Sequence, residues 1–280
     1  MRLFLKHLYL IAFTSLLLAA CDVIEPPYIT DQATNDNMDN PEVVQKFLLE
    51  EFTGHNCPNC PFGSDMAKTL QAFYGDRLIV VSVHAGFFAM PIPPTFVNDF
   101  RTPEGNALNS YFGVAGNPIG MVNRVEFEGD RLMGPNAWGS AMAALANDDP
   151  VVALSLGLTM QPGNSFRLSV EMDALTDLPG EFYLVAVVTE DGIISPQKIN
   201  DPDYPDGYIP EYVHNYVLRR GITDIWGDKL NDERVERGER FERTYDFSMD
   251  DSWMTESCAV VVWIMNEQLE VLQVERVTFS

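Results

Sequence analysis

Apolar and polar residues between positions 43 and 148 alternate with periods that predict strands and helices in turn. Lys46 to Phe52 has the composition of a strand. Leu78 to Val83 is an uninterrupted apolar run, which is typical of a strand covered on both faces. Between them, Phe62 to Tyr74 predicts a helix, because apolar residues recur at spacings of three and four. Its expected buried face consists of Met66, Leu70, Phe73 and Tyr74.

Further elements complete this part of the chain. Thr102 is expected to cap a helix that has Pro103 at its first position. Residues 119 to 133 predict a hairpin that turns at residues 128 to 130, and Asn136 is expected to cap a helix over residues 137 to 146. The order is strand, helix, strand, helix, strand, strand, helix, which matches the thioredoxin fold. The expected buried positions of the last two helices are Ala107, Leu108, Tyr111, Phe112, Trp138, Ala141, Met142 and Leu145.

The pattern changes after Pro150 to short strands separated by turn residues. The predicted strands cover residues 151–160, 166–172, 182–189, 241–247, 259–265 and 270–279. Several short strands with turns between them are typical of a β-sandwich. We therefore expect an α/β thioredoxin-like domain over residues 42–148, followed by an all-β immunoglobulin-like sandwich domain over residues 149–280. The segment from Ile194 to Lys229 interrupts the second pattern.

The first 41 residues predict an export signal and a membrane anchor. Arg2 and Lys6 form a basic start, and the apolar run from Leu8 to Leu18 is too short for a spanning helix. The end of that run resembles a bacterial lipobox, in which residues 1–20 are removed and Cys21 receives acyl chains such as palmitate. The alternative is an ordinary signal peptide, or an uncleaved anchor, with an incidental cysteine. Residues 21–41 would then be the lipidated cysteine and a flexible tether, because few large apolar residues follow.

Charge and location narrow the range of partners. The 280-residue chain has 41 acidic and 18 basic residues, so its net charge is −23. Such a charge argues against nucleic acid as a partner. The sequence has no Gly-rich phosphate loop, and we expect no cofactor. A protein held to a membrane by acyl chains outside the cytoplasm meets an oxidising environment, in which disulfides persist.

Cys57 and Cys60 are the candidate chemical groups. They stand two residues apart at the start of the first predicted helix, where partial positive charge favours a thiolate. The same spacing occurs in redox sites, structural disulfides and metal sites. A metal site needs two further ligands; the sequence has no second Cys-x-x-Cys and no His-x-x-x-His, so we expect no metal. Cys258 lies in an apolar strand and is expected to be a buried, inert thiol, with a redox partnership with Cys57 as the alternative.

Two features elsewhere resemble a thioredoxin site. The segment from Tyr111 to Pro118 is similar to the thioredoxin approach to its cis-proline. Glu51 stands six residues before Cys57, where thioredoxins keep a buried acid. The resemblance implies that Cys57 is the attacking thiolate and Cys60 the resolving thiol. It also implies that Pro118 orients the partner chain and that Glu51 accepts the Cys60 proton through water.

Two histidines have open roles. A positive His55 would lower the pKa of Cys57, whereas the alternative is a loop residue that faces solvent. His84 ends a predicted strand and is either an aid to proton transfer or a satisfied core histidine. The sequence departs from thioredoxins at Asn56, where a tryptophan is frequent. The long interval before Pro118 predicts an insertion over the site around residues 86 to 100.

The chain as a whole resembles the outer-membrane-protein-28-related lipoproteins. The resemblance rests on the lipobox and on the motifs of residues 50–61, 84–86, 100–105, 116–124 and 212–219. It implies an outer membrane location, on the periplasmic or the cell-surface face, and no settled activity. We therefore expect a lipoprotein whose thiol–disulfide exchange site acts on cysteine-containing extracytoplasmic proteins. The alternative is a non-catalytic binding or structural lipoprotein in which the disulfide between Cys57 and Cys60 is only structural.

Overall fold

The first predicted strands form the centre of a sheet in the computed structural model, which describes residues 43 to 279. β1 (Phe47–Thr53) and β2 (Leu78–His84) pair in parallel, with Phe47 opposite Leu78 and Thr53 opposite His84. All seven residues of each strand are buried, which the apolar run from Leu78 to Val83 predicts for β2, whereas β1 also buries Glu50 and Glu51. The predicted signal peptide, the lipidated Cys21 and the tether lie outside the described residues.

Helices cover both faces of these strands. α2 (Cys60–Tyr74) and α4 (Pro135–Leu145) pack on the face that carries Phe47, Leu49, Leu78 and Val80. α3 (Pro103–Tyr111) packs on the opposite face through Leu108. Short 3-10 helices cover Gly75–Arg77, Phe87–Ala89 and Thr255–Ser257. No helix between residues 43 and 279 combines the length and the hydrophobicity that a membrane crossing requires.

The helix ends test the sequence predictions in detail. The Thr102 cap is confirmed, since its Oγ1 accepts a hydrogen bond from the Gly105 amide at 2.9 Å. α4 begins earlier than predicted, with Gly134 rather than Asn136 as its N-cap. The predicted burial is wrong for two residues, since Phe73 is 80% exposed and Tyr111 is 62% exposed. Each lies in the last turn of its helix, beyond the last fully buried residue, which is Ala67 in α2 and Leu108 in α3.

The hairpin predicted over residues 119 to 133 forms only in part. β3 (Ile119–Val122) pairs antiparallel with β1, while isolated bridges join Gly120 to Met133 and Phe127 to Asp130, the second of which encloses the predicted turn. Asn123 and Arg124 follow β3 with φ angles of 47° and 53°. This left-handed conformation turns the chain away from the strand before a second ladder can form.

Strands from the second half of the chain extend the same sheet. Its order is β13-β12-β6-β9-β2-β1-β3, with β10 also paired to β6. β9 joins β2 through a parallel pair between Val217 and Ser82. The added strands are β6 (Phe182–Glu190), β9 (Val217–Gly221), β10 (Asp228–Lys229), β12 (Cys258–Asn266) and β13 (Val271–Thr278). The eight-stranded sheet therefore includes strands from both sides of residue 149, and the predicted domain boundary there stays a prediction.

A second sheet packs against β6 and β12. It contains β4 (Val152–Gln161), β5 (Ser165–Ala174) and β11 (Arg240–Ser248) in the order β11-β5-β4. Its inward residues, such as Leu168 and Val170, form one hydrophobic cluster with Val260 and Val262 of β12. The fold is thus mixed α/β with several sheets and with more residues in strands than in helices.

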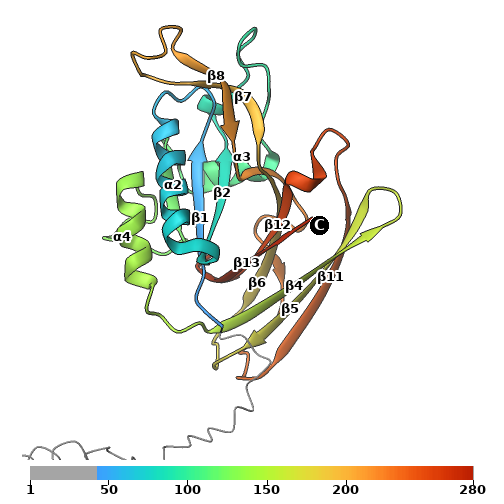
Figure 1. Ribbon diagram of the computed structural model, residues 1–280. Helices are drawn as coiled ribbons and strands as arrows, with labels where there is room; N and C mark the ends of the chain where they lie inside the picture. Colours follow the sequence, from blue (N-terminus) through green and yellow to red (C-terminus); the bar gives the residue numbers. More distant parts are fainter. Residues whose placement is uncertain (1–42, 280) are drawn as a thin grey trace, which may run out of the picture. The chain divides into compact units, whose positions relative to one another are not determined.

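A separate hairpin fills the segment that interrupts the strand pattern. β7 (Ile193–Lys198) and β8 (Tyr208–His214) pair only with each other among the described strands. Figure 1 shows the hairpin at the end of β1, near the start of α2. It therefore stands beside the candidate cysteines.

Candidate functional site

Cys57 and Cys60 form a disulfide between the end of β1 and the start of α2. Cys60 is the first residue of α2, and Pro61 follows at a position where a missing N–H is tolerated. Each cysteine is only 1% exposed. The predicted position at a helix start is confirmed, but the burial of both cysteines was not predicted. No cluster of three or more metal-ligating side chains occurs between residues 43 and 279.

Pro118 and Glu51 meet at the first turn of α2. The peptide bond between Asn117 and Pro118 is cis. A Cβ on Gly63, within α2, would lie 2.7 Å from Pro118 Cβ and 2.8 Å from Glu51 Oε1. Only a glycine lets both groups approach the helix this closely. The structure therefore brings the predicted acid, proline and resolving cysteine together, and it adds Gly63, whose only sign in the sequence is a glycine inside a predicted helix.

Glu51 is fully buried on β1. Its Oε1 accepts a hydrogen bond from Ser64 and its Oε2 accepts one from Ser82, both at 3.2 Å. Burial raises the pKa of the Glu51 carboxyl to about 7, against these hydrogen bonds and the charge of Lys68. A carboxyl with this pKa takes up and releases a proton near neutral pH, which general acid–base chemistry requires.

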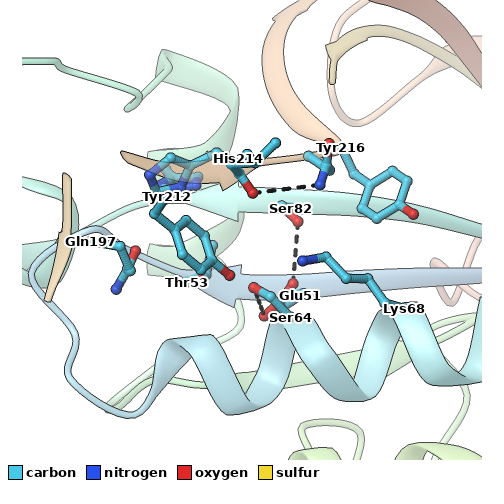
Figure 2. A pocket seen from close by; sticks show the side chains of 12 residues that line it. Glu51, Thr53, Ser64, Lys68, Ser82, Gln197, Tyr212, His214 and Tyr216 are labelled. Atoms are coloured by element: carbon cyan, nitrogen blue, oxygen red, sulfur yellow. Dashed lines mark hydrogen bonds between the residues drawn. The ribbon is translucent and has the colours of Figure 1, made fainter. Parts of the chain in front are cut away.

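A small cavity adjoins Glu51 on the side of the hairpin (Figure 2). Its volume is about 10 Å³, which is at the lower limit for one water molecule. Gln197, Tyr212 and His214 line it from the hairpin, and Lys68 lines it from α2. The Tyr212 hydroxyl is buried without a hydrogen-bond partner among the described residues.

The histidines are packed among aromatic rings. His55 is buried between Phe96 and Phe100, so it does not face solvent, and its Nε2 lies 3.0 Å from the Met90 carbonyl oxygen. Burial lowers the pKa of His55, which leaves the ring neutral at pH 7 without a positive charge for Cys57. His84 is also buried, and its pKa is well below the ordinary value for the same reason.

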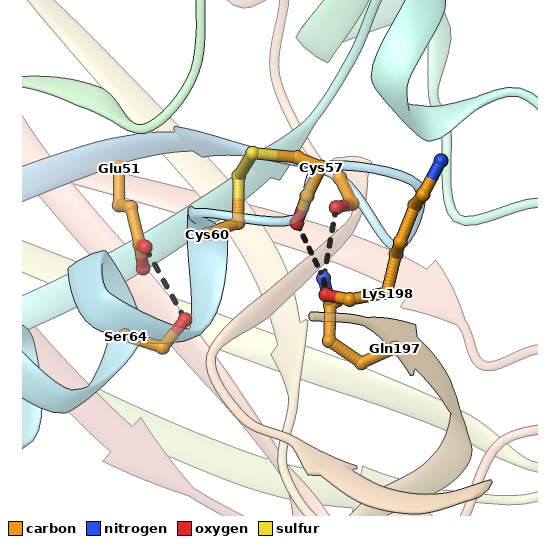
Figure 3. The surroundings of a disulfide bond; sticks show 7 residues. Glu51, Cys57, Cys60, Ser64, Gln197 and Lys198 are labelled. Atoms are coloured by element: carbon orange, nitrogen blue, oxygen red, sulfur yellow. Dashed lines mark hydrogen bonds between the residues drawn. A yellow bond between two sulfur atoms is a disulfide. The ribbon is translucent and has the colours of Figure 1, made fainter. Parts of the chain in front are cut away.

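The hairpin contacts the cysteine loop (Figure 3), and the predicted insertion contacts it as well. Gln197 Nε2 donates to the Cys57 carbonyl at 2.9 Å and to the Gly54 carbonyl at 3.3 Å. The Lys198 amide donates to the His55 carbonyl at 2.8 Å. From the insertion, the Phe88 carbonyl accepts from the Asn56 amide at 2.9 Å. The insertion thus lies against the cysteine loop, as predicted. The position of the hairpin beside this loop was not predicted from the sequence.

Cys258 lies in a different core from the cysteine pair. It is 1% exposed on β12, within the cluster between the two sheets, and its Sγ donates to the Met254 carbonyl at 3.4 Å. Burial raises the pKa of this thiol to about 12. A thiol with that pKa is almost wholly protonated and therefore a poor nucleophile.

Comparisons with known proteins give a family and a fold. A family model described as outer membrane protein Omp28 matches residues 105–280 and so does not reach the cysteine pair. No curated protein matches. Among solved structures, HBP35 of Porphyromonas gingivalis is 20% identical, with a TM-score of 0.65 over 86% of this chain and 77% of that one. An Agrobacterium tumefaciens protein is 11% identical, with a TM-score of 0.54 over 85% and 96%. A domain of the Omp28 lipoprotein of Porphyromonas gingivalis is 14% identical, with a TM-score of 0.32 over 48% and 91%. At these identities the first two similarities indicate a shared fold.

Proposed function

The chain belongs to the Omp28 family of outer membrane proteins, and we propose that it is a lipid-anchored member that exchanges thiols and disulfides through Cys57 and Cys60. One observation carries the proposal. A disulfide at a helix start lies beside Pro118 and a buried carboxyl, and Gly63 leaves room for both. A disulfide that only joins two segments does not require a buried acid with a pKa of about 7 beside it.

The proposal includes a thioredoxin-like architecture for the first part of the chain. It is supported by the order β2-β1-β3, with α2 and α4 on one face and α3 on the other. For the second part we propose a sandwich, supported by the shared cluster between the three-stranded sheet and β6 and β12. An immunoglobulin-like topology remains a prediction for that part.

The reaction begins from the disulfide seen in the structure. A partner thiolate attacks Cys57 Sγ, the bond between Cys57 and Cys60 breaks, and Cys60 leaves as a thiolate. Glu51 gives its proton to this thiolate through one water molecule. A second partner thiolate then attacks the mixed disulfide and releases Cys57. Two electrons pass from the partner dithiol to the cysteine pair, and a low-molecular-weight or protein disulfide outside the cytoplasm oxidises the pair again.

The partners of this reaction are cysteine-containing proteins outside the cytoplasm. The acyl chains on Cys21 would hold the site near the outer membrane. The competing function is a binding or structural lipoprotein whose disulfide never cycles. Its supporting observation is the 1% exposure of both cysteines, because exchange needs a free path to sulfur.

Trapping of mixed disulfides tests the proposal. In the full chain, Cys60→Ala removes the resolving thiol, so Cys57 should accumulate covalent complexes with partner proteins that dithiothreitol releases. The matched control is Cys57→Ala with Cys60→Ala, which should trap nothing. Equal recovery from both variants, or none from either in cells that express them well, would count against exchange.

A further inference from the structure

The hairpin over the cysteine loop is weakly anchored to the rest of the protein. None of the three hydrophobic clusters in residues 43–279 contains a residue between 193 and 214. Ile194 is 65% exposed and Val213 is 44% exposed, so these two apolar side chains point outward. Segments with few buried apolar contacts open at a lower free energy than the core does.

Polar contacts hold the hairpin in place, together with aromatic contacts of Tyr208 with Phe96 and of His214 with Phe100 and His84. Gln197 donates to the Cys57 and Gly54 carbonyls, and the Lys198 amide donates to the His55 carbonyl. Asn98 Nδ2 donates to Ser195 Oγ at 2.9 Å. Water can replace each of these hydrogen bonds, so each adds little net stability to the closed position.

The two stems of the hairpin, which connect it to β6 and to β9, lie side by side, and each contains a residue with a positive φ angle. Gly192 has a φ of 76° and Tyr216 a φ of 58°. The Gly192 amide donates to Asn215 Oδ1, and the Tyr216 amide donates to Asp191 Oδ1. A Cβ on Gly192 would meet no atom within 4 Å. These stems are the narrow connections between the hairpin and strands β6 and β9, and the Tyr216 carbonyl accepts a hydrogen bond from the Ser82 amide at the β9 side of the hinge.

The hairpin covers two parts of the site at once. Gln197 at the end of β7 contacts the loop of the buried disulfide (Figure 3). Tyr212 and His214 of β8 close the cavity beside Glu51 (Figure 2). In the observed position, Cys57 is 1% exposed and Glu51 is 0% exposed, so a partner thiol has no access to Cys57.

We propose that residues 193–214 form a movable cap, which hinges at Gly192 and Tyr216 and must open before a partner thiol can reach Cys57. This inference rests on the proposed function and deepens it, because it makes the observed molecule the closed form of the exchange site. Opening frees the Cys57 and His55 carbonyls from the hairpin and admits water to Glu51. The cap thus links access to the disulfide with hydration of the group that supplies the proton.

The rate at which a phosphine reduces the disulfide tests the cap in the full chain. The disulfide oxidises tris(2-carboxyethyl)phosphine to its oxide and gains two electrons, while water supplies the oxygen atom of the oxide and the two protons of the thiols. Alkylation and intact mass then count the free thiols over time. Gln197→Ala removes the side chain that binds the cysteine loop, and the rate should rise roughly tenfold, as for the loss of hydrogen bonds of ordinary strength. Gln268→Ala changes an exposed glutamine in the turn after β12 and should leave the rate unchanged.

A second variant and a second measurement guard against a folding defect. Asn98→Ala removes a different contact to the cap, at Ser195, and should also raise the rate. Hydrogen exchange of the unaltered protein should show amides of residues 193–214 opening well before those of β1 and β2. Reduction rates equal to that of Gln268→Ala in both variants, or cap amides that exchange only with global unfolding, would overturn the proposal.

The outcomes also separate the cap from the proposed function. If Gln197→Ala and Asn98→Ala are reduced faster but Cys60→Ala traps no partner, the cap is supported and the disulfide does not cycle. Trapped partners together with unchanged reduction rates leave an exchange site without a movable cap.

Discussion

The buried ion pair between Glu50 and Arg124 should be essential for stability, although it lies outside the proposed chemistry. Arg124 is 0% exposed and Glu50 is 1% exposed. Two hydrogen bonds join them, from Nε to Oε2 at 2.6 Å and from Nη2 to Oε1 at 2.8 Å. The guanidinium carbon lies 5.5 Å from the ring centres of Phe112 and of Trp263. The pair therefore connects β1 with β12, strands that lie far apart in the sequence.

Arg124→Met keeps an unbranched side chain but leaves the Glu50 carboxylate buried without its partner. Breaking such a pair from one side costs about 3–5 kcal/mol, which is a large part of the stability of an ordinary domain. Arginine and methionine both carry a Cβ, so the backbone strain from the φ of 53° at position 124 is the same in the unaltered protein and in the variant. The expected loss is therefore electrostatic, with a smaller share from the lost contacts to the two rings.

Urea unfolding measures this loss as a lower midpoint at an unchanged slope. The double variant, Glu50→Leu with Arg124→Met, removes both charges and should recover most of the stability, because an apolar replacement for a buried pair is often neutral or better. A loss below about 1 kcal/mol for Arg124→Met would refute the reasoning. So would a double variant less stable than the single one, since the two losses would then add rather than cancel.

Three further predictions concern single residues, namely Glu51, Gly63 and Cys258. The folded-state pKa of Glu51, about 7, lies above its ordinary value of 4.5, so its contribution to stability is complete below pH 4.5 and is lost as pH rises toward 7. The shift corresponds to about 3 kcal/mol, and urea midpoints measured from pH 4.5 to 8 should fall less steeply in Glu51→Gln than in the unaltered protein. Gly63→Ala places a Cβ against Pro118 and should lower stability by about 1–3 kcal/mol, whereas Gly139→Ala in α4, with only Leu70 Cδ2 nearby at 3.3 Å, should change the melting temperature little. Cys258 should resist iodoacetamide at pH 8 in the native protein, because burial holds its pKa near 12, and rapid labelling detected by mass would contradict this.

The parts of the site that depend on local sequence were predictable. The position of the cysteines at a helix start and the Thr102 cap follow from residue types within a few positions. The approach of Pro118 was found through resemblance to a known motif, because no local pattern places a residue 58 positions beyond Cys60 beside it. The burial of Glu51 was also expected from that resemblance.

The parts that depend on distant contacts were not predictable. Gln197 and Cys57 are 140 residues apart in the sequence, and no periodicity in either segment refers to the other. The pairing of β9 with β2 joins the two halves of the chain in one sheet through Val217 and Ser82, and the strand pattern of neither half indicates this pairing. Phe73 and Tyr111 were expected inside because helical spacing cannot show where a buried stripe narrows at a helix end.

The reduction potential of the pair formed by Cys57 and Cys60 tests the central claim most directly. It should be measured in the full chain with Cys258→Ser, in buffers of defined thiol and disulfide ratio, after equilibration long enough for the cap to open. An exchange site predicts a potential between about −270 and −120 mV, the range from thioredoxin to strongly oxidising enzymes. A potential below about −300 mV is that of a structural disulfide and would contradict the account.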